Sequence, residues 1–527
     1  MLPATSLNAE RIINLIFYKI YFSIYRKMLL AIIVRDHTGY FVYNNYKHYT
    51  SLGLANMLDI FKKPVLHIHM IGICGVGMSA LAGMLLSQGH KVSGSDTDMY
   101  PPISTQLEAL NIPIFKGYSS DTIETIKPDL VIIGNAISRG NPEVEAVLNK
   151  RIPYLSMAGG LYNFFLYNKE VIGVAGTHGK TTTTALLAYI LDHAGMEPSF
   201  FIGGIPKNYG KNYQVAIGKY FVIEADEYDS AYFEKFPKFM VYRPTHCIMT
   251  SLEFDHADIY KDVDEIIVWF TRLKNLIPAN GCIVYNTMYS HLCAINGKPL
   301  SVIKSYGILD ADCCYQYKEG FLTISMDGKS ILAKPKIFGN FNYQNIAAAS
   351  AMALTLGVSE EAIASAIDSF EGVKRRQEIL YTSNYLTIIE DFAHHPTAIR
   401  NVLHEVSERY PQSQIIALYE PRSATSRRNV FQQELPLAFS DADFVLMKRP
   451  YRLDKVPEHE QINIDRVIND IKGQSIPASV FESVDEIVHE AFKLIQNKHT
   501  VMVVMSNGGF DGIYDLLVSQ AQKLFGN

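Results

Sequence analysis

Short apolar runs alternate with longer amphipathic stretches from about residue 66 onward. The runs "LHIHMIG" (66–72), "KVSGSD" (91–96) and "PDLVIIGNA" (128–136) have the length expected of buried strands. Between the first two, "GVGMSALAGMLLSQG" (75–89) has the length of a helix. Because strands that alternate with helices form parallel, doubly wound sheets, we predict an α/β unit that ends near residue 156.

The same alternation returns twice further along the chain. The second block predicts strands in "EVIGVAG" (170–176), "YFVIEAD" (220–226), "CIMTSLEFD" (247–255) and "GCIVYN" (281–286). A helix-rich stretch over 337–357 follows it. The third block predicts strands over 386–395, 414–423, 442–447 and 500–509. We therefore divide the chain into three α/β domains, 65–156, 157–372 and 373–527, behind an extension over 1–64.

The extension has a different composition from the rest of the chain. Its segment 11–34 is rich in Ile, Tyr, Phe and Leu, but lysine and arginine interrupt it before 18 apolar residues accumulate. Three interpretations stay open: a helix on a membrane surface, an extra packed segment, or residues read from a start codon upstream of the true one. We favour the third, with Met28, Met57 and Met70 as internal candidates.

Composition excludes several classes of protein. The chain has 527 residues, 48% hydrophobic and 19% charged, which is typical of a soluble protein with several cores. Its net charge of −5 gives no general basic surface for nucleic acid, and we expect no membrane insertion. The six cysteines contain no CxxC pair, which argues against structural zinc and against disulfides. We expect a reducing, cytoplasmic location.

The stretch "VIGVAGTHGKTTTT" (171–184) has the order of a phosphate-binding loop: strand, glycine turn, helix. It departs from the strict pattern, because Val174 stands where that pattern has glycine. Glycines let backbone N–H groups face phosphate oxygens, Lys180 supplies positive charge, and the Thr181 hydroxyl is a Mg²⁺ ligand. The alternative is a threonine-rich helix N-terminus that binds no nucleotide. A Gly-Lys-Thr turn directly after a buried strand argues against that alternative.

Acidic residues end two predicted strands of the same block. "VIEADEYD" (222–229) places Glu224, Asp226, Glu227 and Asp229 there, and "LEFDHAD" (252–258) places Glu253, Asp255, His256 and Asp258. Ligand groups gather at the carboxyl ends of parallel strands, so these clusters predict a Mg²⁺ shell beside the loop. A solvated acidic loop is the alternative for either cluster alone.

Two further motifs lie in the outer blocks. "GICGVGMSALA" (72–82) places Gly72, Gly75 and Gly77 between a strand and a helix, with Asp96 ending the next strand; it predicts a nucleotide diphosphate on a helix N-terminus, although packing glycines are the alternative. Two strands of the third block end in polar motifs, "EDFAHHPTAI" (390–399) and "YEPRS" (419–423). These motifs predict a loop that faces the substrate; the alternative is polar residues that form hydrogen bonds within the protein. Arg422 is a candidate carboxylate clamp.

Taken in order, these motifs resemble the Mur ligase family. They are "GTHGKTTT" (176–183), "EADE" (224–227), "DH" (255–256), "NxxN" (342–345) and "HHP" (394–396), and the resemblance covers roughly residues 66–527. It implies a three-domain architecture: a Rossmann-like N-terminal domain, a central P-loop ATPase-like domain and a Rossmann-like C-terminal domain. It also implies an ATP- and Mg²⁺-dependent amide ligase of peptidoglycan synthesis. One departure is Phe341, where the family often has histidine.

The resemblance assigns roles to residues of this chain. It implies Lys180, Glu224 and His256 as catalytic residues, with Thr181, Glu224 and His256 as metal ligands. For ATP it implies Gly176, Thr177, His178, Gly179, Lys180, Thr181, Thr182, Asn342, Asn345, Arg375 and Arg376. For a UDP-sugar it implies Gly72, Gly75, Val76, Gly77, Ser95 and Asp96, and for the incoming amine Asp391, His394, His395, Pro396 and Arg422.

Two branches of the family differ in the amine that they add to UDP-N-acetylmuramate. One adds L-alanine, and the other adds the tripeptide L-alanyl-γ-D-glutamyl-meso-diaminopimelate. The stretches "IEADEYDSAYFEK" (223–235), "DFAHHPTAI" (391–399) and "MSNGGFDGI" (505–513) resemble the tripeptide branch more closely. A nucleotide-binding regulatory module and a dehydrogenase are alternatives of other classes; the dehydrogenase leaves the phosphate loop unexplained.

Overall fold

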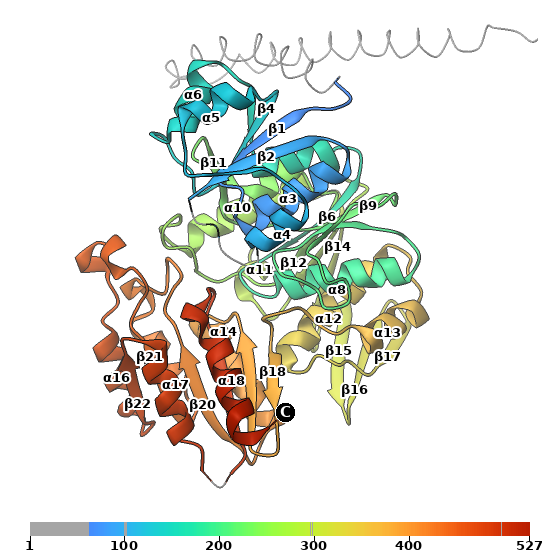
Figure 1. Ribbon diagram of the computed structural model, residues 1–527. Coiled ribbons are helices and arrows are strands. Elements are labelled where there is room, and N and C mark those ends of the chain that lie inside the picture. Colours follow the sequence, from blue (N-terminus) through green and yellow to red (C-terminus); the bar gives the residue numbers. More distant parts are fainter. Residues whose placement is uncertain are drawn as a thin grey trace, which may run out of the picture. The chain divides into compact units, whose positions relative to one another are not determined.

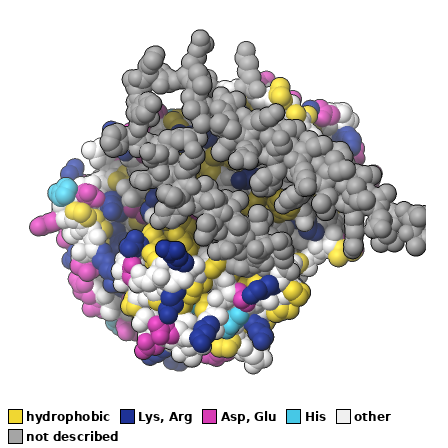
Figure 2. Space-filling model, turned by 90° about the horizontal axis from the view of Figure 1, so that it is seen from above, with side chains coloured by type: hydrophobic (Ala, Val, Ile, Leu, Met, Phe, Trp, Pro, Cys, Tyr) yellow, Lys and Arg dark blue, Asp and Glu magenta, His cyan; other side chains and the backbone are white. Residues whose placement is uncertain are grey.

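The computed structural model describes residues 63–97, 99, 103–295, 297, 299–496 and 498–526. The predicted extension lies almost wholly outside these residues, so its three interpretations stay predictions. Val65–Asn527 forms one compact unit. Within the described residues, no helix combines the length and the apolar character needed to cross a bilayer. On the face seen in Figure 2, basic side chains occur beside acidic and apolar ones.

Three large sheets follow one another along the chain, and helices lie beside each of them (Figure 1). The first sheet has the strand order β3-β2-β1-β4-β5 and is parallel throughout. Its strands are β1 (His67–Ile71), β2 (Lys91–Asp96), β3 (Ile114–Lys116), β4 (Leu130–Ile133) and β5 (Tyr154–Ser156). Its helices are α3 (Val76–Ser87), α4 (Ile103–Ala109), α5 (Ser120–Ile126), α6 (Pro142–Asn149) and α7 (Met157–Leu161), which continues into η1 (Tyr162–Leu166).

The central sheet has ten strands in the order β17-β16-β15-β14-β13-β12-β6-β9-β7-β8. These are β6 (Glu170–Ala175), β7 (Ser199–Phe201), β8 (Tyr213–Gln214), β9 (Tyr220–Glu224), β12 (His246–Met249), β13 (Cys282–Asn286), β14 (Val302–Gly307), β15 (Cys313–Lys318), β16 (Phe321–Met326) and β17 (Lys329–Ala333). A separate hairpin pairs β10 (Asp229–Ala231) with β11 (Glu234–Pro237). The helices are α8 (Lys180–His193), α9 (Lys238–Tyr242), α10 (Val263–Leu276), α11 (Ser290–Cys293), α12 (Asn340–Thr355) and α13 (Glu360–Ser369).

The third sheet has the order β18-β19-β23-β20-β21-β22, and only β18 runs antiparallel to its neighbour. Its strands are β18 (Glu378–Thr382), β19 (Leu386–Asp391), β20 (Gln414–Tyr419), β21 (Phe444–Lys448), β22 (Ala478–Phe481) and β23 (Thr500–Met505). Its helices are α14 (Pro396–Arg409), α15 (Glu434–Leu437), α16 (Ile464–Lys472), α17 (Val484–Lys493) and α18 (Ile513–Phe525).

The third sheet is buried on both faces, which explains why β23 reads as one continuous apolar run. Side chains alternate across a strand. Val501, Val503 and Met505 therefore pack in one core with α14, α15 and α16, while Met502 and Val504 pack in another with α17 and α18. Parallel strands covered on both sides show this composition. The α/β class predicted from the sequence is confirmed.

The outer strands of the central sheet were not among the predicted elements. β15, β16 and β17 form an antiparallel meander at one edge of the sheet. Only one of their faces is fully covered: Leu322 and Ile324 are buried, whereas Phe321 is 46% exposed. Half-buried strands mix polar and apolar residues, so they lack the continuous apolar run by which the other strands were found.

A carboxylate from the third sheet's helix α14 caps α12 beside the central sheet. Glu405 accepts a hydrogen bond from the N–H of Phe341 (2.7 Å) and another from the side chain of Gln377 (2.5 Å). Burial raises the pKa of Glu405 to about 7. Gly339, which precedes the helix, has φ of +94°, and a Cβ at that position would overlap the Glu405 carboxyl group. The N-terminus of α12, which packs on the central sheet, is therefore capped by a side chain from α14 of the third sheet.

We expect Gly339→Ala to lower the thermal unfolding midpoint more than Gly357→Ala does. Gly357 lies just after the same helix, has φ of +87° and has no atom within 4 Å of an added Cβ. Both variants carry backbone strain of about 1–3 kcal/mol. Only Gly339→Ala also displaces Glu405 from its two donors, which costs about 1.5–3 kcal/mol more. Equal midpoints in calorimetry would contradict the proposed cap.

Candidate active site

The phosphate loop, residues 176–181, joins β6 to α8 in the middle of the central sheet. β6 lies between β9 and β12, so the segments that follow those two strands flank the loop. Gly179 has φ of +80°, and a Cβ there would overlap the side-chain oxygen of Asn345, so glycine is required. The N–H of His178 donates to Ser251 Oγ at 2.7 Å, which fixes the loop against the β12 segment.

The side chain of Lys180 lies in a buried cluster of carboxylates. Its Nζ is 2.8 Å from Glu227 Oε2 and 3.5 Å from Asp226 Oδ1, and it donates to the carbonyl of Gly176 at 2.6 Å. Burial disfavours the ammonium, but Glu227 and Asp226 outweigh burial and raise the pKa of Lys180. The lysine is therefore charged at neutral pH and lies where the loop ends.

Two of the predicted metal ligands, Thr181 and Glu224, are in contact, and the third, His256, instead pairs with Glu227. The hydroxyl of Thr181 donates to Glu224 Oε2 at 3.2 Å, and Glu224 also accepts the N–H of Gly203 at 2.5 Å. His256 Nε2 lies 3.1 Å from Glu227 Oε1. Burial raises the pKa of Glu224, so a cation beside it would offset the cost of its ionisation. Hydroxyl and carboxylate oxygens are ligands that Mg²⁺ accepts, so Thr181 and Glu224 fit such an ion, whereas His256 contacts Glu227.

His256 has a left-handed backbone, with φ of 58°. This conformation is uncommon for a residue with a Cβ. The N–H of His256 donates to Asp255 Oδ1 at 2.7 Å, and Asp255 Oδ1 also accepts the hydroxyl of Thr425 at 2.8 Å. Burial lowers the pKa of His256, but Glu227 and Asp255 outweigh it and raise that pKa. Asp255 thus holds the backbone of its neighbour and links it to the third sheet.

The two asparagines predicted for adenine both lie on α12. Asn345 accepts a hydrogen bond from Thr183 Oγ1 at 3.2 Å, and Asn342 donates to the carbonyl of Phe338 at 2.8 Å. The ring of Phe341 lies edge-on to His178, with 6.4 Å between ring centroids. The first turns of α12 therefore meet the phosphate loop, and Phe341 lies beside His178 of that loop.

The structure separates the two arginines predicted for ATP. Arg376 donates to Thr181 Oγ1 at 3.3 Å, and its guanidinium lies 4.7 Å from the ring centroid of Phe392. Arg375 instead pairs with Glu390 at 2.6 Å and donates to two backbone carbonyls after β23. Only Arg376 is brought to the phosphate loop.

The glycine turn after β1 is held by Asp96 from the end of β2. The N–H of Cys74 donates to Asp96 Oδ2 at 2.8 Å. Ser95 is fully buried and donates to Glu143, while Val76 is 49% exposed at the start of α3. The turn and these side chains lie together, and their assignment to a UDP-sugar stays a prediction.

The residues predicted for the amine surround the start of α14. Pro396 occupies its first position, and His395 caps the helix by accepting the N–H of Thr397 at 3.2 Å. Asp391 ends β19, and burial raises its pKa. His394 lies 3.9 Å from Asp255 Oδ2. These groups therefore face the segment that follows β12 in the central sheet.

Arg422 follows β20 on the same edge of the third sheet. Its guanidinium lies 3.3 Å from Glu420 and 4.0 Å from the ring centroid of Tyr451. Glu420 is fully buried and also accepts the hydroxyl of Ser506 at 2.7 Å. The arginine is thus positioned by a buried carboxylate, and a quarter of its side chain remains exposed.

Sequence reasoning missed several partners. Glu405, which caps α12, received no role, and Glu253 was predicted as part of an acidic cluster but not as the partner of His178, 2.8 Å away. Glu227 was predicted only as one member of an acidic cluster, although it is the nearest carboxylate to Lys180. These partners lie 47 to 75 residues apart along the chain, so no local spacing connects them.

Comparisons with known proteins agree with this arrangement. Three family models match in order: Mur ligase family, catalytic domain (67–166); Mur ligase middle domain (174–353); and Mur ligase, glutamate ligase domain (375–508). The UDP-N-acetylmuramate--L-alanyl-gamma-D-glutamyl-meso-2,6-diaminoheptandioate ligase of Escherichia coli K12 is 37% identical, over 87% of this chain and 99% of the relative. The chain belongs to the Mur ligase family.

Two further comparisons place this Mur ligase family member among its relatives. A murein peptide ligase from Psychrobacter arcticus 273-4 superposes with a TM-score of 0.68 at 33% identity, over 88% of this chain and 99% of that one. A UDP-N-acetylmuramate--L-alanine ligase of Desulforapulum autotrophicum is 33% identical, over 74% of this chain and 85% of the relative. The family predicted from the motifs is confirmed.

We expect Arg376→Ala and Arg375→Ala to fail in different ways. Arg376 contacts the phosphate loop, so its loss removes positive charge beside a transferred phosphate and lowers kcat by about 10²–10³-fold. Arg375 pairs with Glu390, so its loss leaves a buried carboxylate without its partner. We expect Arg375→Ala to lower the thermal midpoint more than Arg376→Ala does, and to lower kcat less. Both quantities are measured on each variant, and a larger kcat loss in Arg375→Ala would reverse the assignment.

Proposed function

We propose that this chain is an ATP-dependent ligase that joins L-alanyl-γ-D-glutamyl-meso-diaminopimelate to UDP-N-acetylmuramate in peptidoglycan recycling. The observation that carries the choice of amine is the 37% identity to a ligase named for that tripeptide, which spans 99% of the relative. The buried lysine and carboxylates around the phosphate loop support ATP as the co-substrate. The acid–amino-acid ligase class and the cytoplasmic location, which agrees with six free cysteines, belong to the same proposal.

The reaction that we propose has two steps. The lactyl carboxylate of UDP-N-acetylmuramate attacks the γ-phosphorus of ATP, which forms an acyl phosphate and releases ADP. The free amine of the tripeptide then attacks the acyl carbon, and phosphate leaves as the amide bond forms. Phosphorylation converts a poor leaving oxygen into a good one, so the protein's contribution is mainly positioning and charge neutralisation.

The residues around the loop provide that neutralisation. Lys180 is charged and lies at the loop's end, and Arg376 approaches the same hydroxyl as Glu224. Thr181, Glu224 and His256 would hold Mg²⁺, which screens the charge of the phosphates when bound. Positive groups fixed in advance around a buried site cost little reorganisation during phosphoryl transfer.

The third sheet provides the amine side in this proposal. Asp391 and His394 lie at the end of β19, opposite the segment that carries Asp255. Arg422 lies on the same edge, where its guanidinium matches the carboxylates of the tripeptide. Because the central and third sheets both supply groups, we propose that binding of both substrates closes one onto the other.

A parallel assay tests the function. The protein is incubated with ATP, Mg²⁺ and UDP-N-acetylmuramate, with either L-alanine or the tripeptide as amine, and phosphate release is measured. We expect release with the tripeptide, and a loss greater than about a thousandfold in Lys180→Ala. Release with L-alanine alone would assign the chain to the alanine branch. Release with neither amine would favour the nucleotide-binding module.

We expect Arg422→Ala to raise the KM for the tripeptide by about ten- to a hundredfold, the effect of losing one charged hydrogen bond. The KM for ATP should change far less, because the contacts of Arg422 are with Glu420 and Tyr451 of the C-terminal part of the chain and not with the phosphate loop. Arg449→Ala is the matched control: this arginine of the same sheet forms surface ion pairs with Glu482 and Asp465. Equal changes in both KM values would remove Arg422 from the peptide site.

A further inference from the structure

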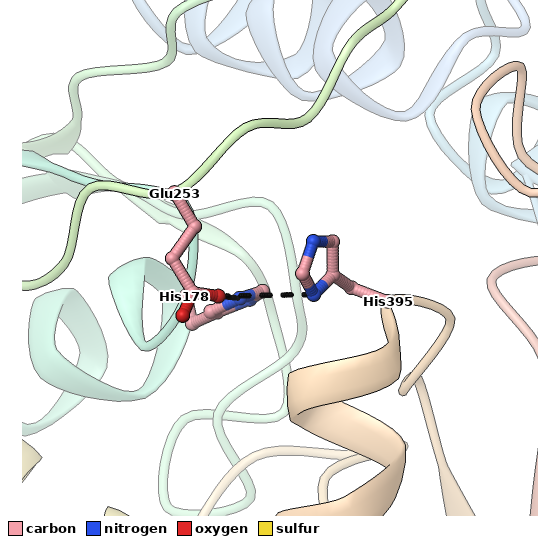
Figure 3. Close-up of side chains that lie close together, drawn as sticks. All are labelled: His178, Glu253 and His395. Atoms are coloured by element: carbon pink, nitrogen blue, oxygen red, sulfur yellow. Dashed lines mark hydrogen bonds and ion pairs between the residues drawn. The ribbon is translucent and has the colours of Figure 1, made fainter. Parts of the chain in front are cut away.

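Two histidines and a carboxylate from three separate segments converge beside the phosphate loop (Figure 3). His178 comes from the loop, Glu253 from the segment after β12, and His395 from the start of α14. His178 Nε2 lies 2.8 Å from Glu253 Oε2, and His395 Nδ1 lies 3.8 Å from the same oxygen. One ligand atom from each residue lies within 4.8 Å of the other two.

The surroundings of His395 set which ring nitrogen faces the cluster. Its Nε2 donates to the carbonyl of Phe254 at 3.2 Å, so Nδ1 carries the lone pair. Imidazoles that bind metals typically donate their other N–H to a carbonyl or carboxylate in this way. The N–H of Thr397 also approaches Nδ1 at 3.2 Å, and a bound cation would compete with that capping bond.

The other two residues are also held in place. His178 is anchored through its backbone, since its N–H donates to Ser251 and its carbonyl accepts the hydroxyl of Thr250 at 2.5 Å. The Glu253 N–H donates to Thr177 Oγ1 at 2.9 Å, which ties the carboxylate's backbone to the same loop. Fixed backbones at all three positions leave only small side-chain movements between the present geometry and coordination.

The type of donor decides which cation fits. Two imidazole nitrogens and one carboxylate suit Zn²⁺, Co²⁺ or Ni²⁺, whereas Mg²⁺ prefers oxygen ligands. The neighbouring group assigned to Mg²⁺, Thr181, Glu224 and His256, offers two oxygen donors and only one imidazole, with further carboxylate oxygens on Glu227 beside His256, so it suits Mg²⁺ better. Among the described residues, one group of three His, Cys, Asp or Glu side chains is close enough to share an ion, and it consists of His178, Glu253 and His395.

We propose that His178, Glu253 and His395 form a binding site for a divalent first-row transition cation, distinct from the Mg²⁺ site of the phosphate loop. A cation there would bridge the loop and the N-terminus of α14, and so connect the central and third sheets. The competing explanation is that the three side chains form only an ion-paired contact between the phosphate loop and the start of α14, with no cation. The two explanations differ in whether a cation binds.

Cobalt binding tests the site directly. The full chain is titrated with Co²⁺ in excess Mg²⁺, and the visible d–d absorption reports nitrogen ligands. We expect one Co²⁺ per chain, and a loss of affinity greater than about a hundredfold in Glu253→Gln and in His178→Asn. Circular dichroism checks that each variant is folded. If Glu253→Gln does not fold, His178→Asn tests the proposal. The titration needs no substrate, so its outcome is independent of the ligation assay.

Two controls locate the bound ion. His404→Asn alters an exposed histidine on α14 that also lies near carboxylates, Asp441 at 3.2 Å and Glu408 at 3.7 Å, and we expect it to leave binding unchanged. His256→Asn alters the neighbouring group and should also leave it unchanged. Absence of the absorption in the wild-type protein would overturn the proposal. So would loss of binding in His256→Asn with retention in Glu253→Gln.

Discussion

The buried charge of Lys180 is the constraint on which the centre of this molecule depends. An ammonium removed from water is costly unless carboxylates compensate for it. Glu227 and Asp226 do so, and each also contacts another basic side chain: Glu227 contacts His256 and Asp226 contacts Lys238, at 3.1 Å in both cases. The ends of β6, β9 and β12 must therefore lie side by side, and the strand order of the central sheet places them there.

A second constraint is that the site is shared between two sheets. The third sheet contributes Arg376 against Thr181, Thr425 against Asp255, and Glu405 at the start of α12. Each contact joins a polar group beside the third sheet to a polar group beside the central sheet. Such contacts exchange readily for water when sheets separate, whereas the apolar cores on each side stay intact. The substrate-driven closure that we propose would alter these polar contacts and leave the apolar cores unchanged.

Most of the fold was predictable because its strands are buried on both faces. β6, β20 and β23 read as continuous apolar runs, and their ends were found to within a few residues. The antiparallel edge of the central sheet was missed because its half-exposed strands alternate polar and apolar residues. Likewise, the predicted strand over 247–255 ends at Met249, since the polar residues after it form the loop that carries His256.

The sequence by itself determined the family and the chemistry of the phosphate loop, because Gly179, Lys180 and Thr181 are adjacent and their spacing alone sets their geometry. Tertiary structure decided which distant groups meet them. It brought Arg376 rather than Arg375 to the loop, and it joined His178 to Glu253. The physical reason is that partners far apart in the chain are selected by strand order and packing, which leave no periodic mark on the residues themselves.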